Sequence, residues 1–479
     1  MARKDPALLT TGNPARRIIV FALPLFAGEF IGIFYTMTDA FIVGRWVGIN
    51  GLAAVGIGSS IIQFVFGFII GITSGFTIIT AQRVGSSGTS NVGASSADST
   101  VGTSATASST VGTTDDEQGV RRSVAAGLSL SLFASVVLTV LFLLLARPLL
   151  SLMQTPAEIM EDASAYVLMI ASGISVFMFY FEIVGIIYAG GDSFSPLIFY
   201  VVGIIGNIIL DILFVAVFSW GVWGAAAATV LAEVIILSLS LRFLVRHFRR
   251  FLPRRQDWFA GRQEFGPHLS LGIAMAFQRC IVEFGNILVQ SAINGFGALT
   301  IAAVSAAQRV RGLNMMPVFA VSRAVTTYTA QNYGADRMDR VYRGMFHACL
   351  ISLGLGVFMA ALNQFTGAPI AALFLKDNPG AVALARQYIL YTGYTVFILG
   401  IMLVFRSTLQ GLGMRRAPIL CSIMETVMSI LAAFVLIPRF GFTGVCLVNP
   451  LSWLASGIPL YIAFGILKSR NRVSLGKGV

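Results

Sequence analysis

The chain has 479 residues, of which 56% are hydrophobic and 11% are charged, and its mean hydropathy is +0.82. Soluble domains have about a quarter of their residues charged, so this composition excludes an ordinary soluble protein. Apolar segments of roughly 20 or more residues recur along the chain, and each is long enough to cross a bilayer as a helix. The segments are continuous rather than alternating, which favours helices over a β-barrel. We therefore predict an all-α polytopic membrane protein.

Twelve membrane spans are predicted from the apolar segments. The first segment is too long for the core of a signal peptide, and no small-residue cleavage site follows it, so we expect it to be retained as a helix. The spans form two sets of six, separated by an arginine-rich stretch. In chain order they cover residues 16–44, 51–83, 120–146, 157–189, 194–218, 222–246, 267–295, 300–332, 340–365, 380–411, 417–437 and 442–467.

The basic residues predict how these spans are oriented. Most of the 33 Lys and Arg residues fall on one side, whereas the other side holds Arg45, Arg147, Lys376 and Arg439. Cytoplasmic loops carry the excess of Lys and Arg, so we expect both termini in the cytoplasm. The net charge of +12 is then a topology signal that also suits contact with anionic membrane lipids. A nucleic-acid partner is not expected.

Composition also divides the chain into regions. Residues 86–118 contain many Ser, Thr and Gly residues and almost nothing bulky, which predicts a disordered cytoplasmic loop inserted into the amino-terminal lobe. We assign residues 1–241 to that lobe, 242–266 to a basic cytoplasmic linker, 267–467 to a carboxyl-terminal lobe and 468–479 to a cytoplasmic tail.

The two lobes resemble each other in sequence. Landmarks of the first lobe recur in the same order in the second, at a shift of 249 residues early in the lobe and of about 221 after the inserted loop. Two duplicated six-helix lobes are a usual plan of secondary transporters, which bind their substrates near the membrane midplane. The landmarks are AQRVG on AQNYG (81–85 on 330–334), GGDSFSP on LGMRRAP (190–196 on 412–418), and Gly221 and Gly224 on Gly441 and Gly444.

Several acidic residues fall inside the predicted spans, where a charge is costly and marks a candidate functional site. Asp39 has no basic residue three or four positions away, so local pairing does not explain it. Burial away from water favours the neutral form of a carboxyl group, so Asp39 could load and release a proton. The acids inside the spans are Glu29, Asp39, Glu182, Asp211, Glu233, Glu283 and Glu425.

Polar residues at four-residue spacing accompany two of these acids. Asn207 and Asp211 share one face of a helix, and a carboxylate beside an amide oxygen suits Na⁺ or a shared proton. Thr229 and Glu233 repeat this spacing on the next helix, although such pairs also serve as hydrogen bonds between helices. Glu283 follows an arginine by four residues, which allows an ion pair.

Taken together, several segments resemble the multidrug and toxic-compound extrusion (MATE) family, and most closely its DinF-like branch. The resemblance covers essentially the whole chain outside residues 86–114. It implies twelve helices in two bundles arranged as a V, which export organic cations and other drugs in exchange for H⁺ or Na⁺ by alternating access. The segments are YTMTDAFIVGRWVGINGLAAVG, LLSLMQTP, GGDSFSPLIFYVVGIIGNIILDILFV, GVWGAAAATVLAE and GNILVQSAINGFG.

The resemblance also implies a coupling site. Asp39 matches the first-helix acid of the DinF-like branch, and Asn207, Asp211 and Thr229 match the polar residues that complete the amino-lobe cation site of the family. Two further acids remain additional candidates. Glu233 stands where the family is commonly apolar, and Glu283 does not align well with the acid that the NorM-like branch uses in its seventh helix.

We therefore predict a monomeric exporter of amphipathic, often cationic, drugs that is coupled to H⁺ or Na⁺ and uses no other cofactor. An enzyme is not expected, because no nucleophile–base pair or metal-ligand cluster is visible. The alternative is a flippase for lipid-linked saccharides, a related architecture that would need a strongly basic central cavity. The arginines inside the spans keep this alternative open, namely Arg279, Arg309, Arg311 and Arg323.

Overall fold

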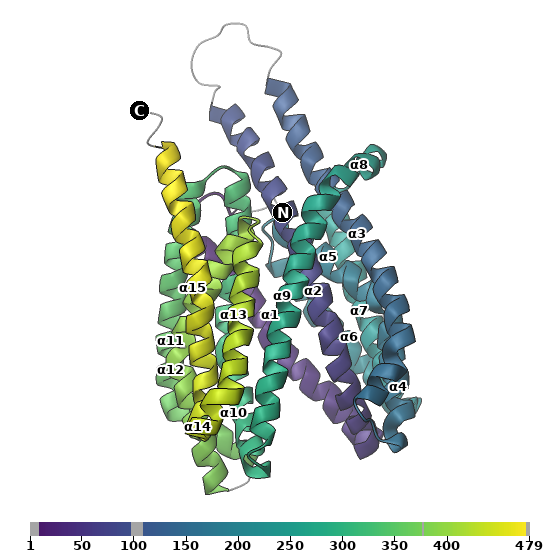
Figure 1. Cartoon of the computed structure of the whole chain (residues 1–479). Helices are drawn as coiled ribbons and strands as arrows, with labels where there is room; N and C mark the ends of the chain where they lie inside the picture. Colours follow the sequence, from purple (N-terminus) through teal and green to yellow (C-terminus); the bar gives the residue numbers. More distant parts are fainter. Residues whose placement is uncertain (1–8, 97–108, 376–377, 476–479) are drawn as a thin grey trace, which may run out of the picture. The chain divides into compact units, whose positions relative to one another are not determined.

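The computed structural model describes residues 9–96, 109–375 and 378–475, and every regular element in this part of the chain is helical (Figure 1). The prediction of an all-α polytopic membrane protein is confirmed. The α-helices are α1 (Pro14–Trp46), α2 (Ile49–Ser96), α3 (Ser109–Leu152), α4 (Ala157–Ser172), α5 (Ile174–Ala189), α6 (Phe194–Asp211), α7 (Gly221–His247), α8 (Arg255–Ala260), α9 (Phe265–Asn294), α10 (Ala298–Gly334), α11 (Met338–Leu375), α12 (Pro379–Gly411), α13 (Arg416–Leu431), α14 (Ile437–Phe440) and α15 (Phe442–Leu475).

Each of the twelve predicted spans corresponds to a helical segment. Within the described ranges, ten helices are long and apolar enough to cross a membrane, and α4 and α5, bent by 45° relative to each other, make an eleventh span. α10 is the twelfth segment. It has 37 residues, but it carries three arginines and is less apolar than the others.

The loop predicted at residues 86–118 is shorter in the structure. α2 continues to Ser96 and α3 begins at Ser109. Residues 97–108 lie outside the described part of the chain, so the expectation for them is not addressed. A helix that has already formed gains one hydrogen bond for each residue it adds, so it extends into a sequence of low helix propensity without a new nucleation step. The predicted disorder is therefore wrong for the two flanks of this loop.

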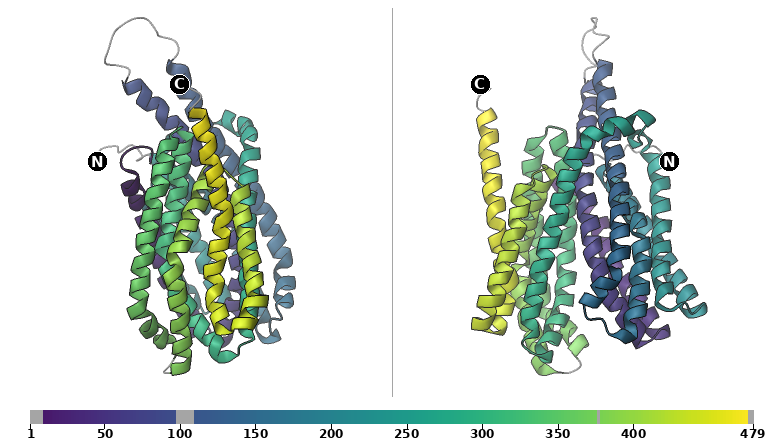
Figure 2. Two further views of the ribbon diagram at one scale, coloured as in Figure 1. Left: turned by 60° about the vertical axis from the view of Figure 1, so that its left-hand side comes forward. Right: turned by 45° about the vertical axis from the view of Figure 1, so that its right-hand side comes forward.

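The chain forms two compact units. Among the described residues, unit 1 comprises Ala27–Ala276, and unit 2 comprises Leu9–Phe26 together with the chain from Phe277 onward. The division falls inside α1 and α9, whereas the sequence predicts a boundary at the linker of residues 242–266. Within each unit the long helices lie alongside one another (Figure 2).

Polar contacts attach the linker to unit 1. Arg121 Nε on α3 donates to Asp257 Oδ2 at 3.2 Å, and the backbone N–H of Arg254 donates to the same oxygen at 2.8 Å. Ser123 Oγ lies 3.1 Å from His268 Nε2. The other ring nitrogen of His268 lies 2.8 Å from a backbone carbonyl, which can only accept, so Nε2 accepts the hydrogen of Ser123. These bonds explain why the linker and the first turns of α9 belong to unit 1.

Small residues bring α9 close to α2 inside unit 1. A Cβ atom added to Gly75 would lie 2.5 Å from Gly272 Cα, and one added to Gly71 would lie 2.6 Å from Ala276 Cα. These residues recur at four-residue spacing on both helices, the pattern that lets membrane helices pack backbone against backbone. The contact anchors the start of α9 beside α2.

The amino-terminal residues that belong to unit 2 are held by α10 and α11. The backbone N–H of Leu9 donates to Gln331 Oε1 at 2.7 Å. Arg340 Nη1 donates to the carbonyl of Gly12 at 2.9 Å, and its Nε donates to Asn332 Oδ1 at the same distance. The chain entering α1 is thereby fixed to unit 2.

Backbone features repeat between the two units and confirm the duplication. A π-helical segment follows α6 at Ile212–Val217 and α13 at Ala432–Leu436, at a shift of 220 residues. Glycines with positive φ, a conformation that side chains disfavour, occupy matching turns. The pairs are Gly48 and Gly297 (φ 93° and 86°), Gly191 and Gly413 (φ 88° and 76°), and Gly221 and Gly441 (φ 60° and 56°).

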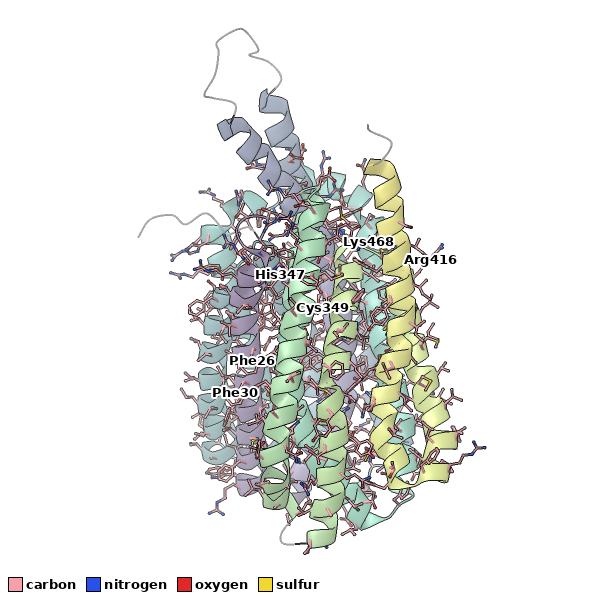
Figure 3. All side chains as sticks on the ribbon, turned by 90° about the vertical axis from the view of Figure 1, so that its left-hand side faces the viewer. Phe26, Phe30, His347, Cys349, Arg416 and Lys468 are labelled. Carbon is pink, nitrogen blue, oxygen red and sulfur yellow. The ribbon has the colours of Figure 1, made fainter. Side chains whose placement is uncertain are left out.

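Basic side chains mark one end of unit 2. Arg416, where α13 begins, and Lys468, near the end of α15, lie at the same end of the unit (Figure 3). The two helices therefore run in opposite directions, and their basic residues collect on one side, as the positive-inside pattern requires.

We predict that Gly75→Ala destabilises the protein by about 1–3 kcal/mol, because the added methyl group forces the backbones of α2 and α9 apart. Gly67→Ala is the matched control, since a Cβ atom at Gly67 on the same helix has nothing within 4 Å. Thermal unfolding of the purified protein in detergent measures the difference. Equal melting temperatures for the two variants would show that this contact does not matter.

Candidate functional site

The end of α6 places two polar side chains in the interior of unit 1. Asn207 and Asp211 lie one helical turn apart on the same face, with 1% and 0% of their surfaces exposed. α6 gives way to the π-helical segment directly after Asp211. Such segments interrupt regular helical hydrogen bonding and occur frequently at functional sites.

α1 contributes the second carboxylate. Asp39 lies one turn beyond Tyr35, so both side chains project from the same face of the helix. The Tyr35 hydroxyl interacts electrostatically with Asp39 and with Asp211, and it lies near the hydroxyl of Thr229 of α7. Thr229 also donates to the carbonyl of Ala225 at 3.1 Å. Tyr35 therefore links the acid of α1 to α6 and α7.

α4 provides a second tyrosine. Tyr166 is 7% exposed, lies within electrostatic range of Asp39 and Asp211, and lies near the hydroxyl of Ser59 of α2. Two phenol groups thus flank the two carboxylates. The sequence interpretation missed both tyrosines; the four-residue spacing between Tyr35 and Asp39 is a signal that could have found the first, whereas Tyr166 gives no such signal.

The sequence predicts one coupling site made of Asp39, Asn207, Asp211 and Thr229. In the structure all four residues lie in unit 1. Asp39 and Asp211 are close enough to interact as like charges. Buried atoms of this cluster have no hydrogen-bond partner among the residues that the structure describes. They are Asp39 Oδ1, both carboxylate oxygens of Asp211, and the amide oxygen and nitrogen of Asn207.

The chemistry of the cluster suits a cation. Two carboxylates in a medium of low dielectric cannot both stay charged cheaply, and a proton or a metal cation relieves the repulsion. Carboxylate, amide and hydroxyl oxygens are also ligands for hard cations. No group of three or more His, Cys, Asp or Glu side chains suited to a metal occurs in the described ranges, so a metal cation here would depend on the amide and hydroxyl oxygens as well.

The two additional candidates lie apart from this cluster. Glu233 is only partly buried and interacts with Tyr200 of α6, and its described interactions do not include Asp39 or Asp211. Glu283 is exposed and lies in unit 2, where Asn286 donates to its Oε2 at 3.2 Å. Glu233 therefore has no described interaction with the two aspartates, and Glu283 belongs to the other unit.

Comparison with known proteins places the chain among membrane transporters. The family model described as MatE matches residues 24–101, 99–213 and 274–435. The probable multidrug resistance protein YpnP of Bacillus subtilis is 24% identical over 463 residues, which cover 96% of this chain and 94% of YpnP. The FAD transporter of Shewanella oneidensis is 24% identical over 278 residues, which cover 57% of this chain and 61% of that protein.

A solved structure described as the outward-facing conformation of a multidrug resistance MATE family transporter of the MOP superfamily shares the fold. Its TM-score is 0.82 at 21% identity, and the match covers 100% of both chains.

We predict that Asp39 and Asp211 are energetically coupled, because each carboxylate repels the other. In a double-mutant cycle at alkaline pH, with Na⁺ replaced by a bulky organic cation, Asp39→Asn and Asp211→Asn should show a coupling energy of about 1 kcal/mol or more.

The matched cycle uses Asp39→Asn with Glu233→Gln and should give a coupling energy near zero. Thermal unfolding in detergent provides the measurement. A coupling energy of the same size in both cycles would contradict the proximity of the two aspartates.

Proposed function

This chain belongs to the MatE family of multidrug efflux transporters, and from that premise we propose that it exports amphipathic organic compounds in exchange for H⁺ or Na⁺. Members of this family are transporters and not enzymes. Amphipathic cations are the compounds that the sequence resemblance favours. The relatives described above are named for multidrug resistance and FAD transport, so we propose export of soluble compounds rather than flipping of lipid-linked saccharides.

One observation carries the coupling proposal. Asp39 and Asp211 present carboxylate oxygens that have no hydrogen-bond partner among the described residues, and in unit 1 Asp211 is buried and Asp39 is partly buried. An uncompensated acid in a membrane helix marks an ion or proton pathway by default. In this proposal Asn207, Thr229 and Tyr35 supply further oxygen ligands when the cation is Na⁺, or hydrogen bonds when it is H⁺.

The same residues provide a mechanism for exchange. A bound cation neutralises the repulsion between α1 and α6, so it stabilises the arrangement in which Asp39 and Asp211 lie close together. The release of the cation restores that repulsion and favours a different arrangement of α1. If the compound binds the second arrangement more tightly, each ligand displaces the other, which is the thermodynamic requirement for antiport.

We further propose that the chain resides in the cytoplasmic membrane of a prokaryote, with both termini in the cytoplasm, and that it functions as a monomer. The concentration of Lys and Arg on one side of the predicted topology supports the orientation. The match of Asp39 to the first-helix acid supports assignment to the DinF-like branch. Anionic lipids are expected to contact the basic side.

We predict that Asp39→Asn abolishes drug export while the protein remains folded in the membrane, because a neutral amide cannot exchange a cation. The measurement is efflux of a fluorescent lipophilic cation from proteoliposomes, driven by an imposed pH gradient and, separately, by a Na⁺ gradient. Glu158→Gln on the exposed first turn of α4 is the matched control and should export normally. Undiminished efflux by Asp39→Asn under both gradients would remove Asp39 from the mechanism.

A further inference from the structure

Unit 2 contains a counterpart of the cation site with the opposite chemistry. The shift of 220 residues that aligns the two π-helical segments places Asn449 of α15 at the position of Thr229. Tyr166 and Tyr388 are each the tenth residue of their helices, α4 and α12. Unit 2 therefore has a tyrosine and a small polar side chain at the positions equivalent to Tyr166 and Thr229.

The two acidic residues of the cation site have no acidic counterparts in unit 2. The counterparts of Asp39 and Asp211 are Leu288 and Leu431, at shifts of 249 and 220 residues. A charged residue of the opposite sign is present instead. Arg311 of α10 lies at the counterpart of Ile62, one helical turn beyond the counterpart of Ser59, whose hydroxyl lies near Tyr166. Unit 2 therefore has leucines at the positions of the two carboxylates and an arginine at a different position, on α10.

The contacts of Arg311 fix the orientation of its neighbours. Arg311 Nη1 donates to Asn449 Oδ1 at 3.1 Å, and Asn449 Nδ2 donates to the hydroxyl oxygen of Tyr388 at 3.0 Å. A guanidinium group has no acceptor, so Asn449 must turn its oxygen toward Arg311 and its N–H groups toward Tyr388. Tyr388 then accepts through its oxygen and keeps its own hydrogen for another acceptor.

No such acceptor is present among the described residues. Tyr388 is 2% exposed, and the bond from Asn449 is the one that its hydroxyl makes within the described ranges. Arg311 uses one of its five N–H groups in the bond to Asn449, and no carboxylate of the described chain pairs with it. The arginine, the amide and the phenol therefore present a set of hydrogen-bond donors that includes one positive charge.

The next turn of α10 also contributes a polar side chain to a pair that has an unused N–H group. Asn314 is 7% exposed and donates to Asn363 Oδ1 at 2.9 Å. The Nδ2 group of Asn363 is buried and has no partner in the part of the chain that the structure describes. The polar face that α10 turns into unit 2 therefore offers N–H groups rather than carboxylates.

The depth of Arg311 makes its charge costly. In the predicted span of residues 300–332, Arg311 lies five residues from the middle, about 8 Å along the helix axis, and a hydrocarbon core extends about 15 Å from its centre. A charge at this depth needs a partner, and a guanidinium pairs best with a carboxylate or phosphate. The acid Glu425 of unit 2 is engaged elsewhere, at 3.9 Å from Arg406 Nη1.

We propose that Arg311, Asn449 and Tyr388 form an anion site, the charge-reversed counterpart of the cation site in unit 1. It takes an oxyanion, either the carboxylate or phosphate group of an exported compound or a free inorganic anion. Where the anion is the carboxylate or phosphate group of an exported compound, the inference rests on the proposed function. The exported compounds then include amphipathic anions, bound in the unit that does not hold the coupling cation.

Two xanthene dyes of similar size and opposite charge provide the transport test. Carboxyfluorescein is the anion and rhodamine 123 is the cation, and their export from proteoliposomes is measured under H⁺ and Na⁺ gradients. We expect the wild-type protein to export carboxyfluorescein. Arg311→Gln should lower this export about tenfold or more, because a charge-assisted hydrogen bond is lost. Arg311→Lys, which keeps the charge, should retain more of it, and rhodamine 123 export should stay unchanged.

Arg386→Gln is the matched control, because Arg386 is exposed on α12 of the same unit and makes no contact with the three residues among its described interactions. A second variant, Asn449→Asp, supplies an internal carboxylate beside Arg311 and should also abolish anion export.

If the wild-type protein exports rhodamine 123 but not carboxyfluorescein, the proposed transport of organic anions is overturned, while the proposed function remains intact. Equal loss of both dyes in Arg311→Gln would overturn the anion site.

A binding measurement covers the free anion and does not depend on transport. Inorganic phosphate should raise the melting temperature of the purified wild-type protein and of Arg386→Gln, but not of Arg311→Gln. Phosphate binding without dye export would assign the site to a free inorganic anion. The absence of both phosphate binding and carboxyfluorescein export would overturn the inference, whereas the failure of rhodamine 123 export as well would overturn the proposed function.

Discussion

The repulsion between Asp39 and Asp211 is the interaction on which the account of this protein depends. The two carboxylates come from α1 and α6, and they lie within electrostatic range of each other inside unit 1. Their buried oxygens have no described hydrogen-bond partners, so the fold does not neutralise them by itself. A cation that enters the cluster removes an unfavourable interaction rather than adding one more contact. In the proposed mechanism, the stability of this arrangement therefore depends on the bound cation.

The duplication supports the proposal that one unit binds the coupling cation. The π-helical segments and the positive-φ glycines recur in both units, so the backbone plan was retained. The side chains diverged, with two carboxylates in unit 1 replaced by leucines in unit 2 and an arginine introduced on α10. A duplicated scaffold with opposite charges can hold two different ligands, which is what exchange of one solute for another requires.

Much of the fold could be predicted from the sequence, because long apolar runs and the distribution of Lys and Arg are strong signals of membrane helices and their orientation. The spacing of Asn207 and Asp211 and the isolation of Asp39 were sufficient to suggest the acids of the site. Tyr166 could not be found in this way, since its role depends on the packing of α4 against α2. Glu233 was a reasonable candidate by spacing, but a four-residue interval does not say which neighbouring helix a side chain faces. The boundary between the units was also hidden, because it falls inside continuous helices.

The most direct test of the central claim is the release of bound cation when a transported compound is added. Purified protein, loaded at fixed pH with or without Na⁺, is mixed with rhodamine 123, and the appearance of free H⁺ or Na⁺ is recorded. The account predicts that binding of the dye releases one of these cations from the wild-type protein and none from Asp39→Asn. Binding of the dye to the wild-type protein with no release of either cation would contradict it.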